Sequence, residues 1–247
     1  GATLAGQSIL LEERIHGPEI SLLALCDGHE LAALPPARDH KRLLDGDQGS
    51  NTGGMGAVAP VALDEQTVAM IMERIMRPAV QALERAGTPF RGALYAGLML
   101  TEHGPRVLEF NARFGDPETQ VILPLIDGDL LPALAACAGI GNMPLSPDML
   151  NWRAGAAACV VLAAHGYPAA PRRGDVITGI EALHYDDVLV FQAGTTWDQG
   201  HIVTDGGRVL GVTGLGRNIA NAVEVAYQAV DYISFDDMQF RHDIGVP

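Results

Sequence analysis

The segment from Arg106 to Glu118 constrains the fold of this chain more than any other. Its first half, Arg-Val-Leu-Glu-Phe-Asn, contains several residues with high strand propensity and predicts a β-strand over 106–111. Because alternate residues of a strand point to the same face, Glu109 and Asn111 should lie side by side, with Arg113 continuing the row. The Gly-Asp-Pro sequence that follows predicts a turn into a helix.

The residue types in this row suit a metal and phosphate site. A carboxylate beside a carboxamide on a rigid strand offers hard oxygen ligands to Mg2+, which takes a few protein oxygens together with substrate phosphates. A guanidinium at the next position can hold a phosphoryl oxygen through two parallel hydrogen bonds. A solvated row of charges at the end of a strand is the alternative, and the short pattern taken alone favours this alternative.

The composition limits the classes of protein to which the chain can belong. Its 247 residues allow one large domain or two modest ones, and 48% hydrophobic residues allow a large core. The net charge of -14 argues against a nucleic-acid partner, because a phosphate backbone would be repelled. Cys26, Cys137 and Cys159 have neither metal-ligand nor disulfide spacing, so we expect buried thiols in a reducing cytosol. Without a long apolar run or a signal peptide, we expect a cytoplasmic protein with no membrane partner.

The first half of the chain predicts a mixture of strands and helices. An antiparallel meander is expected over 8–15, 19–25 and 29–34. Apolar residues at helical spacing predict a helix over 64–86, with Asp64 as its N-cap, Gly87 after its end and a kink at Pro78. Strands over 92–101 and 106–111 and helices over 118–126 and 129–138 complete this half.

The pattern changes after a linker at Pro144-Leu-Ser-Pro147. We expect a buried strand over 156–164, short apolar segments over 175–180, 188–193, 201–203 and 208–215, and a helix over 218–233. This mixture predicts a second α+β region. The sequence Gly211-Val-Thr-Gly-Leu-Gly216 lacks the spacing and the acidic residue of a dinucleotide-binding fingerprint, so we interpret it as a strand-to-helix turn.

The segment from Pro35 to Pro60 is expected to be a long irregular loop, and ordered loops of this length are usually functional. Within it, Asn51-Thr-Gly-Gly-Met-Gly56 could direct several backbone N–H groups into one concavity that suits an anion. Arg38, Lys41 and Arg42 could add positive charge, and His40 is the one histidine that we place near a site. A flexible surface hairpin is the alternative interpretation.

These features together predict a nucleotide site. A meander with carboxylates, a basic glycine-rich loop and a strand that ends in Glu-x-Asn-x-Arg suit Mg2+ and phosphoryl chemistry. The chain has no Gly-x-x-x-x-Gly-Lys-Ser/Thr sequence, which argues against a P-loop fold.

A set of motifs, in order along nearly the whole chain, resembles those of one known family. The motifs are Asp39-His-Lys-Arg42, Asn51-Thr-Gly-Gly-Met-Gly56, Leu94-Tyr-Ala-Gly-Leu-Met99, Glu109-Phe-Asn-Ala-Arg-Phe-Gly-Asp-Pro-Glu-Thr-Gln120, Gly174-Asp-Val-Ile177, Gly206-Gly-Arg-Val-Leu210 and Asp243-Ile-Gly245. They resemble the phosphoribosylamine–glycine ligase family, whose members are ATP-grasp enzymes of purine biosynthesis. The resemblance implies an α+β protein, with an N-terminally truncated ATP-grasp domain over 1–143 and a small C-terminal α+β domain over 144–247.

The resemblance also implies roles for particular residues. Glu109 and Asn111 would bind Mg2+ or Mn2+, while Arg113 and Lys41 would be catalytic, Arg113 by steadying the transferred phosphoryl group. The segment Glu12, Glu13, Arg14 and Ile15 would hold the adenine of ATP, and Glu19 its ribose. The other substrates or the acyl phosphate would be bound by Asp39, His40, Thr52, Gly53, Gly54, Met55, Gly56, Asp116 and Glu118, with help from Lys41.

The implied activity is the ATP-dependent ligation of glycine to 5-phosphoribosylamine through glycyl phosphate, giving glycinamide ribonucleotide, ADP and phosphate. The partners would be these small molecules, and the protein would be a monomer or a homodimer. The chain begins where the family's ATP-grasp domain is already under way, so we expect a truncated product with poor ATP affinity. The alternatives are another ATP-grasp carboxylate–amine ligase and a non-catalytic nucleotide-binding fragment.

Overall fold

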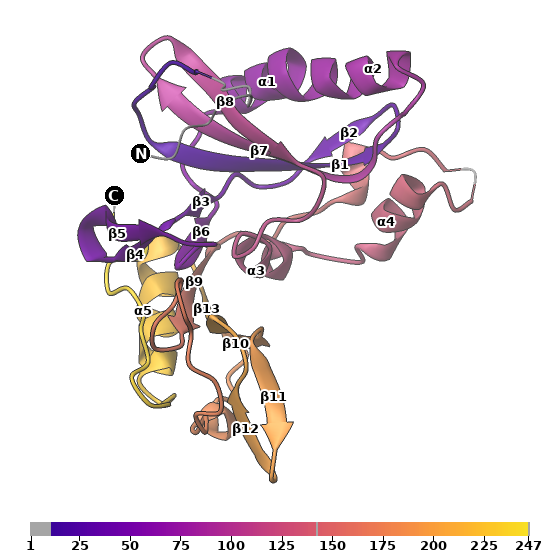
Figure 1. The fold of residues 1–247 in the computed structure, drawn as a ribbon. Coiled ribbons are helices and arrows are strands. Elements are labelled where there is room, and N and C mark those ends of the chain that lie inside the picture. The colour runs from indigo at the N-terminus through magenta and orange to yellow at the C-terminus, as the bar shows by residue number, and fades with distance from the viewer. Residues whose placement is uncertain (1–10, 142, 247) are drawn as a thin grey trace.

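Two antiparallel sheets organise the fold, which we describe from a computed structural model for residues 11–141 and 143–246. The first sheet has four strands in the order β2-β1-β7-β8, and the second has five in the order β10-β13-β9-β6-β3 (Figure 1). Helices α1 and α2 lie above the first sheet, and helix α5 packs on the second. The expected mixture of helices and antiparallel strands is therefore confirmed.

The first sheet is formed by the segments with the strongest strand pattern. Its strands are β1 (Glu19–Asp27), β2 (Leu31–Ala33), β7 (Arg91–Thr101) and β8 (Gly104–Asn111). The expected strand over 8–15 is wrong for residues 11–15, which have no regular structure, and residues 8–10 lie outside the described residues. Four of these five residues are exposed, so they have no apolar face that a sheet could bury.

The expected helix over 64–86 forms in three parts: α1 (Glu65–Ile71), a π-helical turn (Met72–Met76) and α2 (Arg77–Arg85). Asp64 caps it by accepting a hydrogen bond of 2.7 Å from the backbone N–H of Thr67. Pro78 cannot donate a helical hydrogen bond, and beside it the N–H of Arg77 reaches back five residues to the carbonyl of Met72. Ile71, Met76 and Val80 from this helix cover the upper face of the first sheet.

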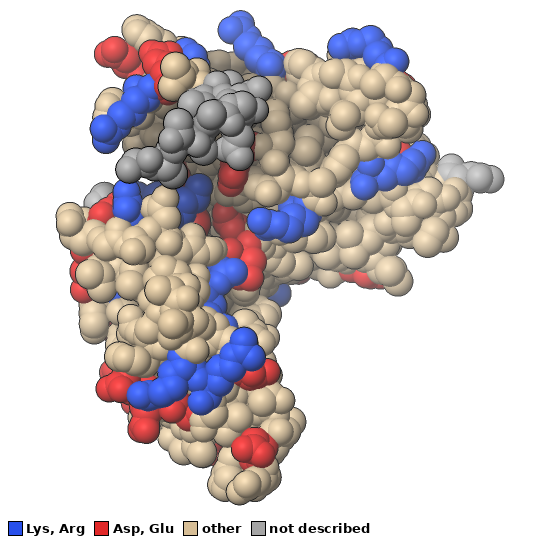
Figure 2. Space-filling view, in the orientation of Figure 1, with Lys and Arg blue, Asp and Glu red and all other residues tan. Residues whose placement is uncertain are grey.

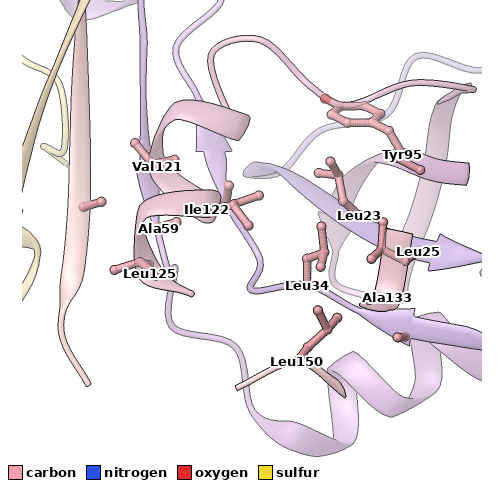
Figure 3. Close-up of a cluster of buried hydrophobic side chains, with 14 of the residues drawn as sticks. Leu23, Leu25, Leu34, Ala59, Tyr95, Val121, Ile122, Leu125, Ala133 and Leu150 are labelled. Atoms are coloured by element: carbon pink, nitrogen blue, oxygen red, sulfur yellow. The ribbon is translucent and has the colours of Figure 1, made fainter. Parts of the chain in front are cut away.

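The lower face of the first sheet packs against α3 (Thr119–Ile122), the 3-10 turn Leu123–Leu125 and α4 (Leu131–Ala138). Figure 3 shows this core, in which Leu23 of β1 lies near the ring of Tyr95 and Leu25 lies nearer Leu34 and Ala133. Both helices are shorter than expected: α3 gives way to the 3-10 turn that contains Pro124, and α4 begins at Leu131 with Pro132 in its first turn.

The second sheet takes strands from both ends of the chain. Its strands are β3 (Arg38–Asp39), β6 (Gly56–Ala59), β9 (Ala156–Ala163), β10 (Val188–Gln192) and β13 (Arg208–Gly216). Helix α5 (Ile219–Val230) packs closely on β13, since a Cβ at Gly214 would lie 2.5 Å from the backbone nitrogen of Ala226. The glycines of the 211–216 motif therefore serve helix–strand packing as well as the turn into α5.

The expected irregular loop over 35–60 is wrong, because this segment is largely folded. Between β3 and β6 it forms a hairpin of β4 (Arg42–Leu44), a 3-10 turn (Asp45–Asp47) and β5 (Gln48–Asn51). Since β6 pairs with β9, the second sheet crosses the division at residue 143 that we expected between two domains, and that division stays a prediction.

The remaining elements are peripheral. Strands β11 (Thr195–Asp198) and β12 (His201–Thr204) form a separate hairpin that projects from the second sheet (Figure 1). Short 3-10 turns occur at Pro147–Met149 and Ile180–Ala182, and the short apolar segment over 175–180 makes isolated bridges at Val176 and Thr178. The three cysteines are free and buried, and none of the described helices is long and apolar enough to cross a membrane.

Candidate active site

A polar cluster occupies one end of the lower face of the first sheet. In the strand register, Ser21 of β1 lies opposite Gly97 of β7, which lies opposite Glu109 of β8. Residues that are directly opposite in antiparallel strands point to the same face, so the polar side chains of these strands converge there. In Figure 2, acidic and basic side chains gather in the recess where the first sheet's half of the molecule meets the second.

Glu109 and Asn111 lie side by side, as the spacing predicts. The Nδ2 of Asn111 is 3.3 Å from Oε1 of Glu109, and the Glu109 side chain is exposed. Gly97 provides the space that Glu109 occupies, because a Cβ there would be 3.1 Å from Cγ of Glu109. The pair fits a hard divalent cation that also takes phosphate and water oxygens. Among the described residues, no group of three or more His, Cys, Asp or Glu side chains could hold a metal ion.

Lys41 brings a cation to this pair. Its Nζ is 3.2 Å from Oε2 of Glu19, at the start of β1. Burial lowers the pKa of Lys41, but Glu19, Asp39 and Glu109 raise it, and the net shift is upward. Lys41 is therefore a fixed positive charge among three carboxylates, which suits the binding of an anionic substrate group rather than proton transfer.

Glu118 forms the buried floor of the cluster. Its side chain is 3% exposed, and its Oε1 accepts a hydrogen bond of 2.8 Å from Oγ of Ser21. The hydroxyl of Tyr95 is 2.8 Å from the same Ser21 oxygen. Burial, and then the charge of Glu118, raise the pKa of Tyr95, so the phenol stays protonated. Neither Ser21 nor Tyr95 was among the predicted site residues.

Asp39 is a second enclosed carboxyl group. Burial, and then the nearby Glu118, raise its pKa well above the ordinary value, although Lys41 and Arg208 act in the opposite direction. Its Oδ1 is buried and makes no hydrogen bond within the described part of the chain. Asp39 and Glu118 thus form an electrostatically coupled acidic pair beside Lys41.

The loop from Thr52 to Gly56 lies next to this pair, but the expected nest of open N–H groups is wrong. The N–H groups of Thr52 and Met55 donate to the carbonyls of Lys41 and His40, and that of Gly54 donates to Oγ1 of Thr52. The N–H of Gly53 donates to the hydroxyl of Tyr167 at 2.9 Å. These four donors are thus taken by protein acceptors, and only Thr52 and Gly53 of the loop present surface to a substrate, since Gly54, Met55 and Gly56 are buried.

Arg208 of β13 joins this loop to the turn after β8. Its Nη1 donates to the carbonyls of Gly53 and Asp116, at 2.7 and 2.8 Å, and its Nη2 is 2.9 Å from Oδ2 of Asp116. Arg208 lies in the Gly206-Gly-Arg-Val-Leu210 motif but was not among the predicted site residues. The loop is more than one hundred residues away in the sequence, so local periodicity carries no signal for this contact.

Other predicted site residues lie at the edges of the cluster. Strand β8 ends at Asn111, so Arg113 lies in the bend that follows, where its Nη1 donates to the carbonyl of Phe114. In the segment 12–15, Glu13 pairs with Arg106 of β8 at 3.6 Å. His40 is buried, and its Nε2 contacts the backbone nitrogen of Gly245 at 3.4 Å, so it packs against the C-terminal segment instead of facing a substrate.

Comparison with known proteins assigns this arrangement to a family. A model of the phosphoribosylglycinamide synthetase ATP-grasp (A) domain matches residues 2–119, and a model of the C domain of the same synthetase matches residues 157–247. The chain belongs to the phosphoribosylglycinamide synthetase family. The A-domain match includes the Glu109–Asn111 pair and the loop 52–56, and the C-domain match includes Arg208.

Individual proteins of this family are similar to the chain over nearly all of its length. The chain is 48% identical over 241 residues to the phosphoribosylamine–glycine ligase of Synechocystis sp., covering 97% of this chain and 57% of that protein. It is similar to the crystal structure of phosphoribosylamine–glycine ligase from Thermotoga maritima, with a TM-score of 0.84 and 39% identity over 94% of this chain and 56% of that one. The chain thus spans about half the length of these relatives.

More distant structures share the fold alone. The biotin carboxylase domain of 2-oxoglutarate carboxylase from Hydrogenobacter thermophilus has a TM-score of 0.65 and 14% identity, and covers 90% of this chain and 46% of that one. This likeness agrees with the ATP-grasp fold expected for the synthetase family.

Proposed function

We propose that this chain forms the catalytic half of an ATP-dependent ligase that joins glycine to 5-phosphoribosylamine. The observation that carries the proposal is the Glu109–Asn111 pair beside Lys41, in a chain that matches both the A and the C domain of the synthetase family. Glycine, phosphoribosylamine and ATP would be its partners, with Mg2+ or Mn2+ as the metal, in the cytoplasm and as a monomer or a homodimer.

The reaction requires the glycine carboxylate to attack the γ-phosphate of ATP, which gives glycyl phosphate and ADP. The amine of phosphoribosylamine then attacks the acyl carbon, loses a proton and releases phosphate, and an amide forms. Glu109 and Asn111 would hold the metal, which when bound neutralises charge on the phosphates. Lys41 and Arg113 would attract the same anionic groups, since an anion must approach a polyanion in the first step.

The remaining residues divide between the nucleotide and the two other substrates. The segment Glu12, Glu13, Arg14 and Ile15 would hold the adenine through backbone groups, and Glu19, which lies beside Lys41, would reach the ribose. Asp39, Glu118 and Asp116 would bind the amine groups of the substrates, because carboxylates near the reacting atoms attract ammonium and accept its protons. Thr52 and Gly53 would contact the same substrates from the loop, supported by the buried residues Gly54, Met55 and Gly56 and by His40.

The Glu109→Ala variant tests the proposal. We expect glycine-dependent release of ADP to fall by at least about 100-fold at saturating Mg2+, because the metal loses a charged ligand, with little change in the thermal midpoint. Glu102→Ala, in the exposed turn between β7 and β8, is the matched control and should keep the wild-type rate. A Glu109→Ala rate within a factor of three of the wild type would reject the assignment.

A nucleotide-binding fragment without turnover is the second candidate, because the chain spans about half the length of its relatives. Calorimetry of the 247-residue chain with ATP, with and without Mg2+, distinguishes the two candidates when it is combined with the ADP-release assay. Metal-dependent binding without turnover would favour the fragment, and turnover with a different amine substrate would favour another ligase of this fold.

A further inference from the structure

Two side chains from the second sheet's half of the molecule, Arg208 and Tyr167, bind the backbone carbonyl and the backbone N–H of Gly53. The guanidinium of Arg208 donates to the Gly53 carbonyl at 2.7 Å, and the hydroxyl of Tyr167 accepts from the Gly53 N–H at 2.9 Å. Gly53 is one of the two loop residues that present surface beside the acidic pair of Asp39 and Glu118. Its orientation is therefore determined by residues more than one hundred positions later in the chain.

The same guanidinium also fixes the turn that follows β8. It donates to the Asp116 carbonyl at 2.8 Å and to the Asp116 carboxylate at 2.9 Å. One planar group thus joins the loop at Gly53 to the turn at Asp116, and the Arg208 side chain is only 22% exposed. Lysine could not satisfy three acceptors in two directions, because its ammonium lacks the fixed fork of donors.

Glycines at positions 53, 54 and 207 allow Arg208, Asp39 and Tyr167 to approach the backbone closely. A Cβ at Gly53 would lie 3.0 Å from Cζ of Arg208, so a larger residue would push the guanidinium away. A Cβ at Gly207 would overlap the ring of Tyr167, so the absence of a side chain at Gly207 allows the ring to pack against the backbone there. A Cβ at Gly54 would be 2.7 Å from Oδ1 of Asp39, so a displaced loop would also disturb that carboxyl group.

We propose that Arg208 is a positioning residue that, together with Tyr167, holds the Gly53 loop against Asp116 and so shapes the side of the site that receives the amine substrates. This inference rests on the proposed function for the identity of those substrates. The ATP side of the site is formed by Glu109, Asn111 and the segment 12–19, and none of the hydrogen bonds of Arg208 goes to these residues.

The first experiment requires no activity. Hydrogen exchange of the loop amides in the 247-residue chain should be at least about 10-fold faster in Arg208→Gln than in the wild type. Tyr167→Phe should accelerate exchange chiefly at the Gly53 amide, which loses its acceptor. Arg217→Gln is the matched control, because Arg217 follows the same strand and contacts Asn221 rather than the loop. Unchanged exchange over residues 52–55 in Arg208→Gln would overturn the proposal, whatever the protein catalyses.

The second experiment separates positioning from general stability. Arg208→Gln should raise KM for glycine or phosphoribosylamine by about 10- to 100-fold, because displacement of a substrate-binding loop by about 1 Å can have an effect of this size. KM for ATP should change less than threefold. Arg208→Lys should rescue little of the loss. An equal rise in KM for ATP would overturn the proposal. An inactive wild type would instead reject the proposed function and leave the exchange result to decide the role of Arg208.

Discussion

His40 should make the stability of this protein depend on pH between about 4 and 6.5. The side chain is 7% exposed and lies near Arg241 and Arg38. Burial, and then these two cations, lower the pKa of His40 from 6.5 to about 4, while the Gly56 carbonyl and Asp243 act in the opposite direction. The folded protein therefore keeps His40 neutral where the unfolded chain binds a proton.

The sign and size of the effect follow from this difference. Above pH 6.5 the histidine is neutral in both states, and stability is at its full value. As the pH falls towards 4, the unfolded state binds more protons than the folded state, so the free energy of unfolding falls. A shift from 6.5 to about 4 corresponds to a total loss of about 3 kcal/mol, of which about 2.5 kcal/mol is lost by pH 4.5.

Urea unfolding of the wild type and of His40→Gln at pH 7.5 and pH 4.5 measures this contribution. Asp39 has a raised pKa and Asp243 a lowered one, so the wild-type pH dependence also contains their effects. The difference between the two proteins isolates His40, since glutamine does not titrate and its amide oxygen can replace Nε2 as the acceptor for Gly245. The variant should lose about 2.5 kcal/mol less than the wild type between the two pH values. Equal losses in both proteins would refute the reasoning.

Two further predictions concern the supports of the site. Ser21→Ala removes a hydrogen bond of 2.8 Å to the buried carboxylate of Glu118. The free energy of unfolding in a urea titration at pH 7.5 should therefore fall by about 1–3 kcal/mol. Ser50→Ala in the exposed strand β5 is the control and should lower it by less than about 0.5 kcal/mol. Gly214→Ala should lower the free energy of unfolding by about 1–3 kcal/mol, because the new Cβ would lie 2.5 Å from the backbone nitrogen of Ala226 and separate α5 from β13. An unchanged thermal midpoint would show that the helix shifts without cost.

The parts of the structure that sequence analysis predicted correctly depend on local information. The contact between Glu109 and Asn111 follows from the two-residue period of a strand, and the helix from Asp64 follows from its apolar spacing and its cap. The π-helical turn Met72–Met76 also has a local cause, the missing N–H of Pro78, although only a kink was predicted there. These features require no knowledge of distant parts of the chain.

The predictions that failed concern segments whose structure is set by distant partners. Residues 56–59 lack an obvious strand pattern, yet they form β6 because β9, one hundred residues later, pairs with them. The glycine-rich loop has the composition of an anion nest, but its N–H groups donate to the hydroxyl of Tyr167 and to the carbonyls of His40 and Lys41, among other groups. Sequence composition identified this loop as important and could not show which groups it binds.

The two halves of the molecule therefore build the candidate site together. Strands β3 and β6 pair with each other, and β6 pairs with β9 of the second sheet, while Lys41 between them forms an ion pair with Glu19 of β1. At the far end of the hairpin, Arg241 is 2% exposed and pairs with Asp47 and Asp243 at 2.7 and 2.6 Å. At the near end, Arg208 holds Gly53. Because both arginines follow residue 200, a chain that ended after α4 would keep Glu109 and Asn111 but lose the hydrogen bonds that Arg208 and Arg241 make to the loop and to the hairpin.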